Sequence, residues 1–330
     1  MTGSASVCSW AKERNCICPA RTLPLETLSI MNGNVFIDLK GLFTTGLQDT
    51  ITEWVSSLRA VSSWIARPSY ASTGLPPIMR RPAAPKSPDE YHRLKEAGQL
   101  ASAMRRYAGS LVEAGVTTDD LDAAVHEEIV RHGAYPSPLN YAGFPKSICT
   151  SVNSVLCHGI PNEHPLQEGD LLKIDVSVFY NGVHGDCCGT FIVGRGSEEA
   201  IRLAEAVRRA CQVGVEACGP GIDVGEIGIA IETFASAEGY TVSETFVGHG
   251  IGVDLHELPH IMHSKSAIEY EGGRLQPGMV FTIEPILVNG READHVVLDD
   301  GWTARSTGDY LAAQHEEMVG ITEDGYEILT

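Results

Sequence analysis

The order of helix and strand signals along the chain predicts an α+β fold in which two similar halves enclose one site. Three observations support this prediction: a first helix pair, then a strand-rich stretch, and then a second helix pair followed by strands up to the C-terminus. A chain that repeats helices and then strands indicates two related halves, although no residue-level repeat is visible in this sequence.

The first helix pair is predicted from its start signals. Residues 87–90 read Ser-Pro-Asp-Glu, which combines a capping hydroxyl, a proline at the first helical position and acids in the first turn. We expect this helix to continue to about Ala114 and to end at Gly115. A second helix should begin at Thr118. Its inward-facing residues are expected to be Leu121, Val125 and Ile129.

The strand-rich stretch and the second helix pair are predicted from a change of period. Residues 148–191 carry β-branched runs and turn residues in place of helical stripes, which indicates sheet. Helices are expected over about residues 198–218 and 224–238, separated by Gly-Pro-Gly at 219–221. Strand-like segments then return.

Within the strand-rich stretch, Asn181-Gly182 predicts a two-residue β-hairpin. In that turn Ser177 faces Asp186, and Ser177 points to the same side as Asp175 because strand side chains alternate. The two aspartates would be diagonal neighbours, about 7–8 Å apart at Cα, close enough to converge on a metal pair. The alternative is that both are solvent-facing acids on an edge hairpin. However, Asp175 lies inside an apolar strand, where an unpaired charge is costly.

Three further positions complete a candidate metal site. His249 lies between glycines that let backbone approach closely, and Glu284 lies inside an apolar run. Glu316 precedes Glu317, and alternation lets only one of these two face inward. With the two aspartates, four carboxylates and one imidazole form a chelator suited to Mn²⁺, Fe²⁺, Co²⁺ or borderline Zn²⁺. The pattern indicates a two-metal hydrolase, although any single histidine is more often structural.

The composition bounds the class of protein. The 330 residues are 43% hydrophobic, enough for a sizeable core, and the formal charge of −19 opposes attraction to nucleic-acid phosphates. No stretch approaches the roughly 18–20 apolar residues that cross a bilayer. The nine cysteines are scattered and odd in number, which favours a reducing compartment over a disulfide framework. We therefore expect no nucleic-acid partner, no membrane partner and no secretion.

The N-terminal part differs in composition from the rest. Residues 1–85, rich in Ser, Thr and Pro, are expected to be a partly disordered extension with a proline-rich arm, and residues 86–330 a compact domain. Three cysteines without a nearby fourth ligand give only a weak zinc signal: Cys8, Cys16 and Cys18. One amphipathic helix is predicted within the extension by apolar residues at helical spacing. They are Leu47, Ile51, Trp54, Leu58, Val61 and Ile65.

Seven segments, in order, resemble the type 1 methionine aminopeptidases, which are dinuclear peptidases with the pita-bread fold. They are 140–147 (Asn-Tyr-Ala-Gly-Phe-Pro-Lys-Ser), 157–161 (Cys-His-Gly-Ile-Pro), 173–176 (Lys-Ile-Asp-Val), 184–186 (His-Gly-Asp), 248–252 (Gly-His-Gly-Ile-Gly), 282–285 (Thr-Ile-Glu-Pro) and 313–316 (Ala-Gln-His-Glu). The resemblance runs from about residue 88 to the C-terminus. It implies the pita-bread (creatinase/aminopeptidase-like) fold, with two pseudo-symmetric α/β halves around a central antiparallel sheet, as a catalytic domain over residues 86–330.

The resemblance also implies residue roles. The ligands of two divalent metal ions (Co²⁺, Mn²⁺, Fe²⁺ or Zn²⁺) would be Asp175, Asp186, His249, Glu284 and Glu316. Glu284 would carry a proton to the leaving amine, His256 would stabilise the oxyanion, and His158 would orient the scissile amide. With these two histidines, the substrate-binding residues would be Tyr141, Phe144, Cys149 and Trp302.

The implied activity is removal of the N-terminal methionine from nascent polypeptides whose second residue is small, by attack of a metal-activated water. Ribosome association and a monomeric state are further expectations. We expect a cytoplasmic location. A mitochondrion or plastid is the alternative if the extension is a transit peptide, which residues 1–30, with two glutamates beside two arginines, support only weakly.

The chain departs from the resembled family at two places. Cys187-Cys188 follow Asp186 where the family commonly has a hydroxyl residue, which is expected to place two thiols beside the metals. The first 60 or so residues do not match the zinc-finger extension of the eukaryotic cytosolic form.

Two alternative functions use the same fold. A prolidase or Xaa-Pro aminopeptidase has the same five ligand types but usually carries a substantial folded N-terminal domain, for which the segment before residue 88 is too short and polar. A peptide- or ribosome-binding protein that has lost catalysis would lack ligands, and all five are present here.

Overall fold

The computed structural model describes residues 28–31, 34–37, 61, 64–78, 84–266 and 273–330. The chain divides into two compact units, residues 1–57 and 58–330. In the first unit, β1 (Leu28–Met31) pairs with β2 (Asn34–Ile37) in antiparallel fashion. The three N-terminal cysteines and almost all of the expected amphipathic helix lie outside the described residues. The expected boundary near residue 85 stays a prediction.

Helix α3 (Pro88–Ser110) begins as its sequence predicts. Ser87 is the N-cap, and its hydroxyl oxygen accepts a 3.2 Å hydrogen bond from the Glu90 N–H, with Pro88 at the first position. The helix ends four residues earlier than expected. The Leu111 N–H bonds back to Ala108 and Gly109, which tightens the last turn and stops the helix.

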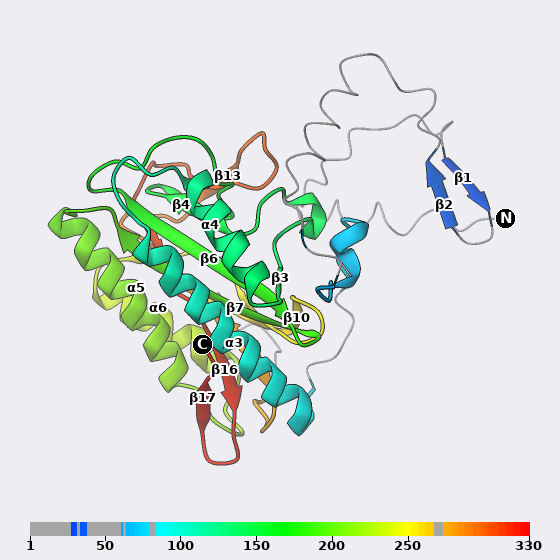
Figure 1. The fold of residues 1–330 in the computed structure, drawn as a ribbon. Coiled ribbons are helices and arrows are strands. Elements are labelled where there is room, and N and C mark those ends of the chain that lie inside the picture. The colour runs from blue at the N-terminus through cyan, green and yellow to red at the C-terminus, as the bar shows by residue number, and fades with distance from the viewer. Residues whose placement is uncertain (1–27, 32–33, 38–60, 62–63, 79–83, 267–272) are drawn as a thin grey trace. The chain divides into compact units, whose positions relative to one another are not determined.

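Helix α4 (Thr118–Arg131) begins with a capping box between Thr117 and Asp120. The three residues expected to face inward are all buried: Leu121, Val125 and Ile129. In the second helix pair, α5 (Glu198–Glu216) and α6 (Gly225–Ala237) lie side by side, each within about two residues of its predicted bounds. Both helix pairs are visible in Figure 1.

The predicted hairpin forms the longest strand pair of the described residues. In β6 (Leu171–Tyr180) and β7 (Val183–Ile192), Tyr180 pairs with Val183 and Ser177 with Asp186, as a two-residue turn requires. Asn181 and Gly182 both adopt positive φ, 50° and 81°, as that turn demands. On its other side β6 pairs with β4 (Cys149–Val152) and β3 (Tyr135–Pro136).

The remaining strands form three further antiparallel sheets among the described residues. One contains, in spatial order, β10 (Glu257–Ile261), β9 (Gly248–Gly250), β11 (Val280–Ile283), β16 (Glu317–Ile321) and β17 (Tyr326–Ile328). A second contains β15 (Ala312–Gln314), β12 (Ile286–Val288) and β8 (Thr241–Val242). A third contains β13 (His295–Val297), β14 (Ala304–Ser306) and β5 (Val155–Cys157).

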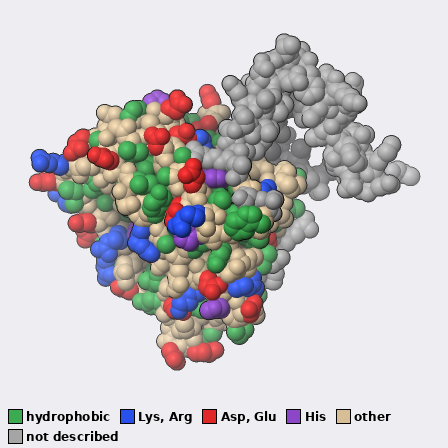
Figure 2. All heavy atoms as spheres, viewed as in Figure 1, with side chains coloured by type: hydrophobic (Ala, Val, Ile, Leu, Met, Phe, Trp, Pro, Cys, Tyr) green, Lys and Arg blue, Asp and Glu red, His purple; other side chains and the backbone are tan. Residues whose placement is uncertain are grey.

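Two large apolar clusters correspond to the two halves. In one, α3 and α4 pack on β6 and β7, and in the other, α5 and α6 pack on β11, β12, β15 and β16. The strands between these helix pairs carry the polar side chains described next. Among the described residues no helix is both long and apolar enough to cross a membrane. On the face drawn in Figure 2, acidic, basic and apolar side chains are interspersed.

Candidate metal centre and substrate pocket

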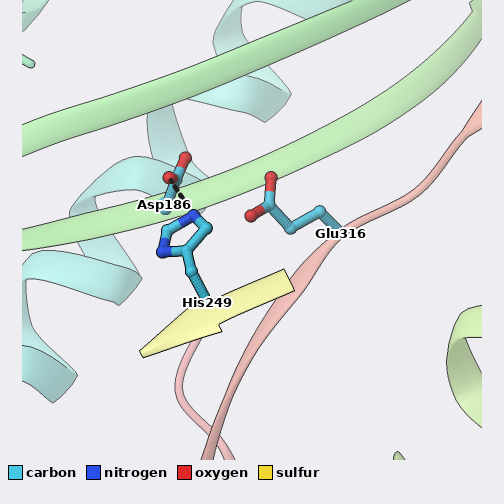
Figure 3. Close-up of side chains that lie close together, drawn as sticks. All are labelled: Asp186, His249 and Glu316. Carbon is cyan, nitrogen blue, oxygen red and sulfur yellow. Dashed lines mark ion pairs between the residues drawn. The ribbon is translucent and has the colours of Figure 1, made fainter. Parts of the chain in front are cut away.

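Three buried side chains from three different segments point toward one another (Figure 3). They are Asp186 on β7, His249 on β9 and Glu316 in the connection from β15 to β16. One ligand atom of each lies within 4.8 Å of the others. His249 Nε2 lies 3.8 Å from Asp186 Oδ2 and 3.5 Å from Glu284 Oε1. Glu284, directly after β11, therefore faces the same point.

The tautomer of His249 suits a metal ligand. Its Nδ1 lies 3.1 Å from the Gly250 carbonyl oxygen, which can only accept, so Nδ1 carries the hydrogen. The lone pair of Nε2 is then directed at the carboxylate oxygens. Burial lowers the pKa of His249 to about 4, so the ring is neutral near pH 7. A neutral imidazole held by a backbone carbonyl is the usual form of a histidine metal ligand.

Residues outside the five predicted ligands orient Glu284. The Thr282 hydroxyl donates to Glu284 Oε1 at 2.8 Å, and Gln314 Nε2 donates to Oε2 at 3.4 Å. Thr282 also accepts the His249 N–H at 3.1 Å, which ties two expected ligands to one hydroxyl. The backbone N–H of Glu284 donates to His263 Nε2 at 3.2 Å. Sequence reasoning missed these roles for Thr282, Gln314 and His263.

The carboxyl groups are strongly perturbed. Burial raises the pKa of Asp175 to about 7 and that of Glu284 to about 8. Burial, with repulsion from neighbouring carboxylates, also raises the pKa values of Asp186 and Glu316. The charge of Asp175 contributes to the raised pKa of each of the other three, so all four groups interact.

This donor set fits divalent cations. Four buried or partly buried carboxyl groups with raised pKa values, together with one imidazole lone pair, form an anionic site that two positive ions would neutralise. Carboxylate and imidazole ligands suit Mn²⁺, Fe²⁺, Co²⁺ and Zn²⁺.

Glu317 points away from this group, as strand alternation predicts. It receives a 3.2 Å hydrogen bond from Arg105 Nη2 and lies 3.1 Å from His315 Nε2. Burial opposes its ionised form, but the hydrogen bonds and the Arg105 charge outweigh burial and lower its pKa to about 2. Arg105 Nη1 also donates to the carbonyls of Cys188 and Glu316, so α3 holds two segments of the site together.

A cluster of aromatic side chains lies near the expected ligands. Phe144 and Trp302 meet edge to face at 5.1 Å between ring centroids, and Trp302 lies 6.2 Å from the His158 ring. Phe246, which the sequence did not single out, meets His158 edge to face at 5.6 Å. Cys149 is buried on β4, opposite Asp175 of β6. An apolar wall with a thiol suits an unbranched apolar side chain.

Two histidines lie near this cluster of aromatic side chains and the expected ligands. His158 adopts a left-handed φ of 56°, an uncommon conformation for a residue with a Cβ atom. His256 lies 4.3 Å from His249 between ring centroids, and its Nδ1 is 2.6 Å from the Tyr141 hydroxyl. Burial lowers the pKa of His158 to about 4 and also lowers that of His256. Both imidazoles are therefore neutral near pH 7.

The model of metallopeptidase family M24 matches residues 92–323, which contain every one of these groups. The chain belongs to this family. It is thus a metallopeptidase, as the sequence predicted, and family membership implies the use of divalent metal ions.

Within family M24, several relatives that the chain matches at 40–46% identity are named methionine aminopeptidases. It is 44% identical to human mitochondrial methionine aminopeptidase 1D over 276 residues, which cover 84% of this chain and 81% of that protein. It is 46% identical to methionine aminopeptidase A from Synechocystis over 242 residues, covering 73% of this chain and 94% of the relative. The predicted recognition of the type 1 methionine aminopeptidases is confirmed.

Solved structures give the same fold. Methionine aminopeptidase from Rickettsia prowazekii is 38% identical, with a TM-score of 0.73, and the match covers 75% of this M24 chain and 99% of that one. Prolidase from Pyrococcus furiosus matches with a TM-score of 0.60 at 24% identity, covering 75% of this chain and 65% of the prolidase, and shows only the common fold. The predicted pita-bread fold is confirmed.

One expectation about this M24 site needs correction. Cys188 shares the face of Asp186, and its thiol lies 3.7 Å from Gln314 Oε1. Cys187 instead joins the apolar cluster under α3 and α4, and its thiol faces the Val176 carbonyl. Since β7 alternates its side chains, two consecutive cysteines cannot both face the metal group. Of these two thiols, only that of Cys188 lies on the metal side.

Proposed function

We propose that the chain removes the N-terminal methionine from newly made polypeptides whose second residue is small. The cluster of Asp186, His249 and Glu316, together with the aromatic pair of Phe144 and Trp302, is the observation that carries this proposal. A metal group near an apolar aromatic surface suits a substrate with a free amine and an apolar first side chain. Two relatives, which the chain matches over 81% and 94% of their length, are named methionine aminopeptidases, and this agrees with the proposal.

The proposed ligands are the five residues identified from the sequence: Asp175, Asp186, His249, Glu284 and Glu316. When bound there, two divalent ions would supply hydroxide near neutral pH and an anchor for the free α-amine. Anchoring of the amine would make the enzyme an exopeptidase. The donor set favours Mn²⁺, Fe²⁺, Co²⁺ or Zn²⁺.

Glu284 is proposed to move the proton. Both of its oxygens are held, by Thr282 and Gln314, so the carboxylate presents a fixed orientation to the scissile bond. A carboxylate held in a fixed orientation at the metal group is placed to pass a proton from water to a leaving group. Glu284 would accept the proton from the attacking water and donate it to the leaving amine nitrogen.

His256 and His158 are proposed to act on the scissile amide. When the Tyr141 hydroxyl donates to His256 Nδ1, the ring hydrogen lies on Nε2, where it can donate to the oxygen of the tetrahedral intermediate. His158, held between Phe246 and Trp302, would orient the amide before attack. Tyr141 and Cys149 complete the methionine pocket.

The test is peptide hydrolysis followed by mass spectrometry. Met-Ala-Ser and Ala-Pro-Phe are incubated with the full chain and Mn²⁺ or Co²⁺, and again with a chelator. Metal-dependent loss of methionine alone supports the proposal. Cleavage before proline would move the chain to prolidase activity, and no cleavage of either peptide would point to a binding protein.

Two substitutions test the residue roles. Glu284→Gln and His256→Ala should each lower kcat by about 10²-fold or more, because each removes a proton-transfer or oxyanion contact. Metal content is measured in parallel. Unchanged turnover with intact metal content would remove that residue from the mechanism.

The cellular location rests on the N-terminal extension. Several relatives at 41–44% identity carry mitochondrial or chloroplastic in their names, which favours the organellar alternative over the cytoplasmic expectation. Imaging of the full chain fused at its C-terminus to a fluorescent protein, beside a fusion lacking residues 1–57, would decide between them. Sedimentation of the purified chain alone and with ribosomes tests the proposed monomer and ribosome association.

A further inference from the structure

The described part of the arm, residues 64–78, contacts Tyr141 of the proposed methionine pocket through one buried aromatic side chain. Tyr70, in the short helix η3 (Ser69–Ser72), is 1% exposed, and its hydroxyl donates a 2.6 Å hydrogen bond to the Ser137 carbonyl. Its ring meets Tyr141 edge to face, with 4.9 Å between centroids and 85° between planes. The Tyr70 ring also stacks on the His184 ring, with 6.2 Å between centroids and 16° between planes. Tyr70 is therefore held by one hydrogen bond and two ring contacts.

The segment that carries Tyr141 is strained and is held by the arm. Asn140 and Ala142, on either side of Tyr141 in and before η4 (Tyr141–Gly143), have left-handed φ values of 61° and 48°. Asparagine tolerates this conformation, whereas alanine rarely adopts it unless surrounding contacts impose it. One such contact comes from the arm, because Asn140 Nδ2 donates to the Ala71 carbonyl at 3.1 Å.

Tyr141 leads directly to an imidazole at the site. Its hydroxyl lies 2.6 Å from His256 Nδ1, and the two rings are 5.1 Å apart. His256 in turn lies edge-on to His249 at 4.3 Å. The packed series Tyr70, Tyr141, His256 thus runs from the arm to the ring that faces the scissile amide in the proposed function.

We propose that Tyr70 is a positioning residue that acts through Tyr141 on His256, which makes the arm a working part of the catalytic site. The inference rests on the proposed function, because its effect appears in turnover of a methionine peptide. Tyr70 touches no reacting group. Its ring fixes where the Tyr141 hydroxyl lies, and that hydroxyl fixes both the orientation and the tautomer of His256.

A double-mutant cycle tests this series. Tyr70→Ala and Tyr141→Phe are each expected to lower kcat on Met-Ala-Ser about tenfold, because a displaced catalytic group loses alignment. In the Tyr141→Phe background, Tyr70→Ala should change kcat less than about twofold, since both changes act through one hydroxyl. Independent effects, which multiply to about a hundredfold loss, would overturn the proposal, and so would an unchanged kcat in Tyr70→Ala.

Three control variants separate positioning from folding. Tyr70→Phe keeps the ring and should retain kcat within about twofold. Ile65→Ala removes another buried arm side chain of the same apolar cluster, so it should lower thermal stability while kcat stays near wild type. If Tyr70→Ala does not fold, Tyr70→Leu keeps the apolar volume and takes its place in the cycle. Equal losses of kcat in Tyr70→Phe and Tyr70→Ala, or in Ile65→Ala and Tyr70→Ala, would reject positioning by the ring.

The same measurements separate this inference from the proposed function. If the wild-type chain with metal does not release methionine, the proposed function fails before the cycle begins. If wild type releases methionine and the cycle is additive, the activity stands and only the role of Tyr70 is rejected.

Discussion

Ser177 on β6 and Asp186 on β7 face each other across the hairpin, and Ser177 Oγ donates a 2.8 Å hydrogen bond to Asp186 Oδ1. The other carboxylate oxygen, Oδ2, lies toward His249 Nε2. The hydroxyl therefore occupies one oxygen and leaves the other directed at the proposed metal position. A partner of this kind fixes the angle at which a carboxylate meets a cation.

Removal of the Ser177 hydroxyl should weaken metal binding. We expect Ser177→Ala to lower Mn²⁺ affinity about 10- to 100-fold, because loss of a hydrogen-bond partner to a ligand has effects of that size. Calorimetric titration of the metal-free chain measures the affinity. Ser154→Ala, which removes a hydroxyl bonded to Asp309 in an exposed region, should leave it unchanged. Equal affinities for Ser177→Ala and wild type would contradict the prediction.

The hairpin shows why part of this site could be predicted from the sequence. The Asn-Gly turn fixes the register, and the alternation of strand side chains then decides which residues share a face, so both aspartates and Ser177 follow from local rules. The same alternation separates Cys187 from Cys188. The expectation of two thiols beside the metals was therefore incorrect, because consecutive residues of a strand face opposite sides.

The contacts that orient Glu284 could not be predicted in this way. Gln314 and His263 reach it from segments 30 and 21 residues away, and no local pattern gives their positions. Helix starts were likewise predicted better than helix ends. Four residues at the start of α3 predict the cap at Ser87, whereas no glycine or proline directly follows the end of the helix at Ser110.

The metal-free chain should become more stable as the pH falls from about 8 to about 6.5. Burial raises the pKa of Glu284 to about 8 and that of Asp175 to about 7, so in this range the folded chain binds more protons than the unfolded one. Asp186 and Glu316 act in the same direction. Burial lowers the pKa of Lys173 to about 7, so this group has the opposite effect on the pH dependence of stability. It is a single group, whereas four carboxyl groups act in the stated direction.

Below about pH 6.5 the trend should weaken, because buried histidines with lowered pKa values favour unfolding once the unfolded chain protonates them. These include His158, His249 and His263. Urea unfolding in chelator measures the free energy of unfolding at each pH. Glu284→Gln should flatten the dependence between pH 8 and 6.5, and saturating Mn²⁺ should do the same in wild type. A fall in stability over that interval in the chelated wild type would count against the raised pKa values of these carboxyl groups.

Replacement of Arg105 should lower the stability of the folded chain. Arg105→Leu removes a donor from the Glu316 carbonyl and one of two donors from the Cys188 carbonyl, and it leaves the partly buried Glu317 carboxylate without its cation. We expect a loss of about 2–3 kcal/mol in the free energy of unfolding, at or below the lower end of the range for fully buried pairs, because this pair is only partly buried. Denaturant unfolding measures it. Arg106→Leu, at the exposed neighbouring position, should change stability by less than about 0.5 kcal/mol. Similar losses in the two variants would show that Arg105 has no special role.

Asp300 should control substrate affinity through Trp302. Its carboxylate accepts the N–H groups of Trp302 and Thr303 at 2.8 Å each and the Thr303 hydroxyl at 2.6 Å. Partial burial opposes ionisation, but these hydrogen bonds outweigh it and lower the pKa of Asp300 below its ordinary value of 3.8. The carboxylate is therefore ionised at neutral pH and holds the turn that presents Trp302 to Phe144.

Asp300→Ala should raise KM for Met-Ala-Ser about fivefold, since loss of one net hydrogen bond corresponds to about 1 kcal/mol. Because Asp300 does not contact Glu284 or His256, kcat should stay within about twofold of wild type. Steady-state kinetics at saturating Mn²⁺ give both constants. Asp299→Ala removes the same charge from the adjacent exposed position and should change neither constant. A lowered kcat with an unchanged KM would place the turn in the chemical step and not in the methionine pocket.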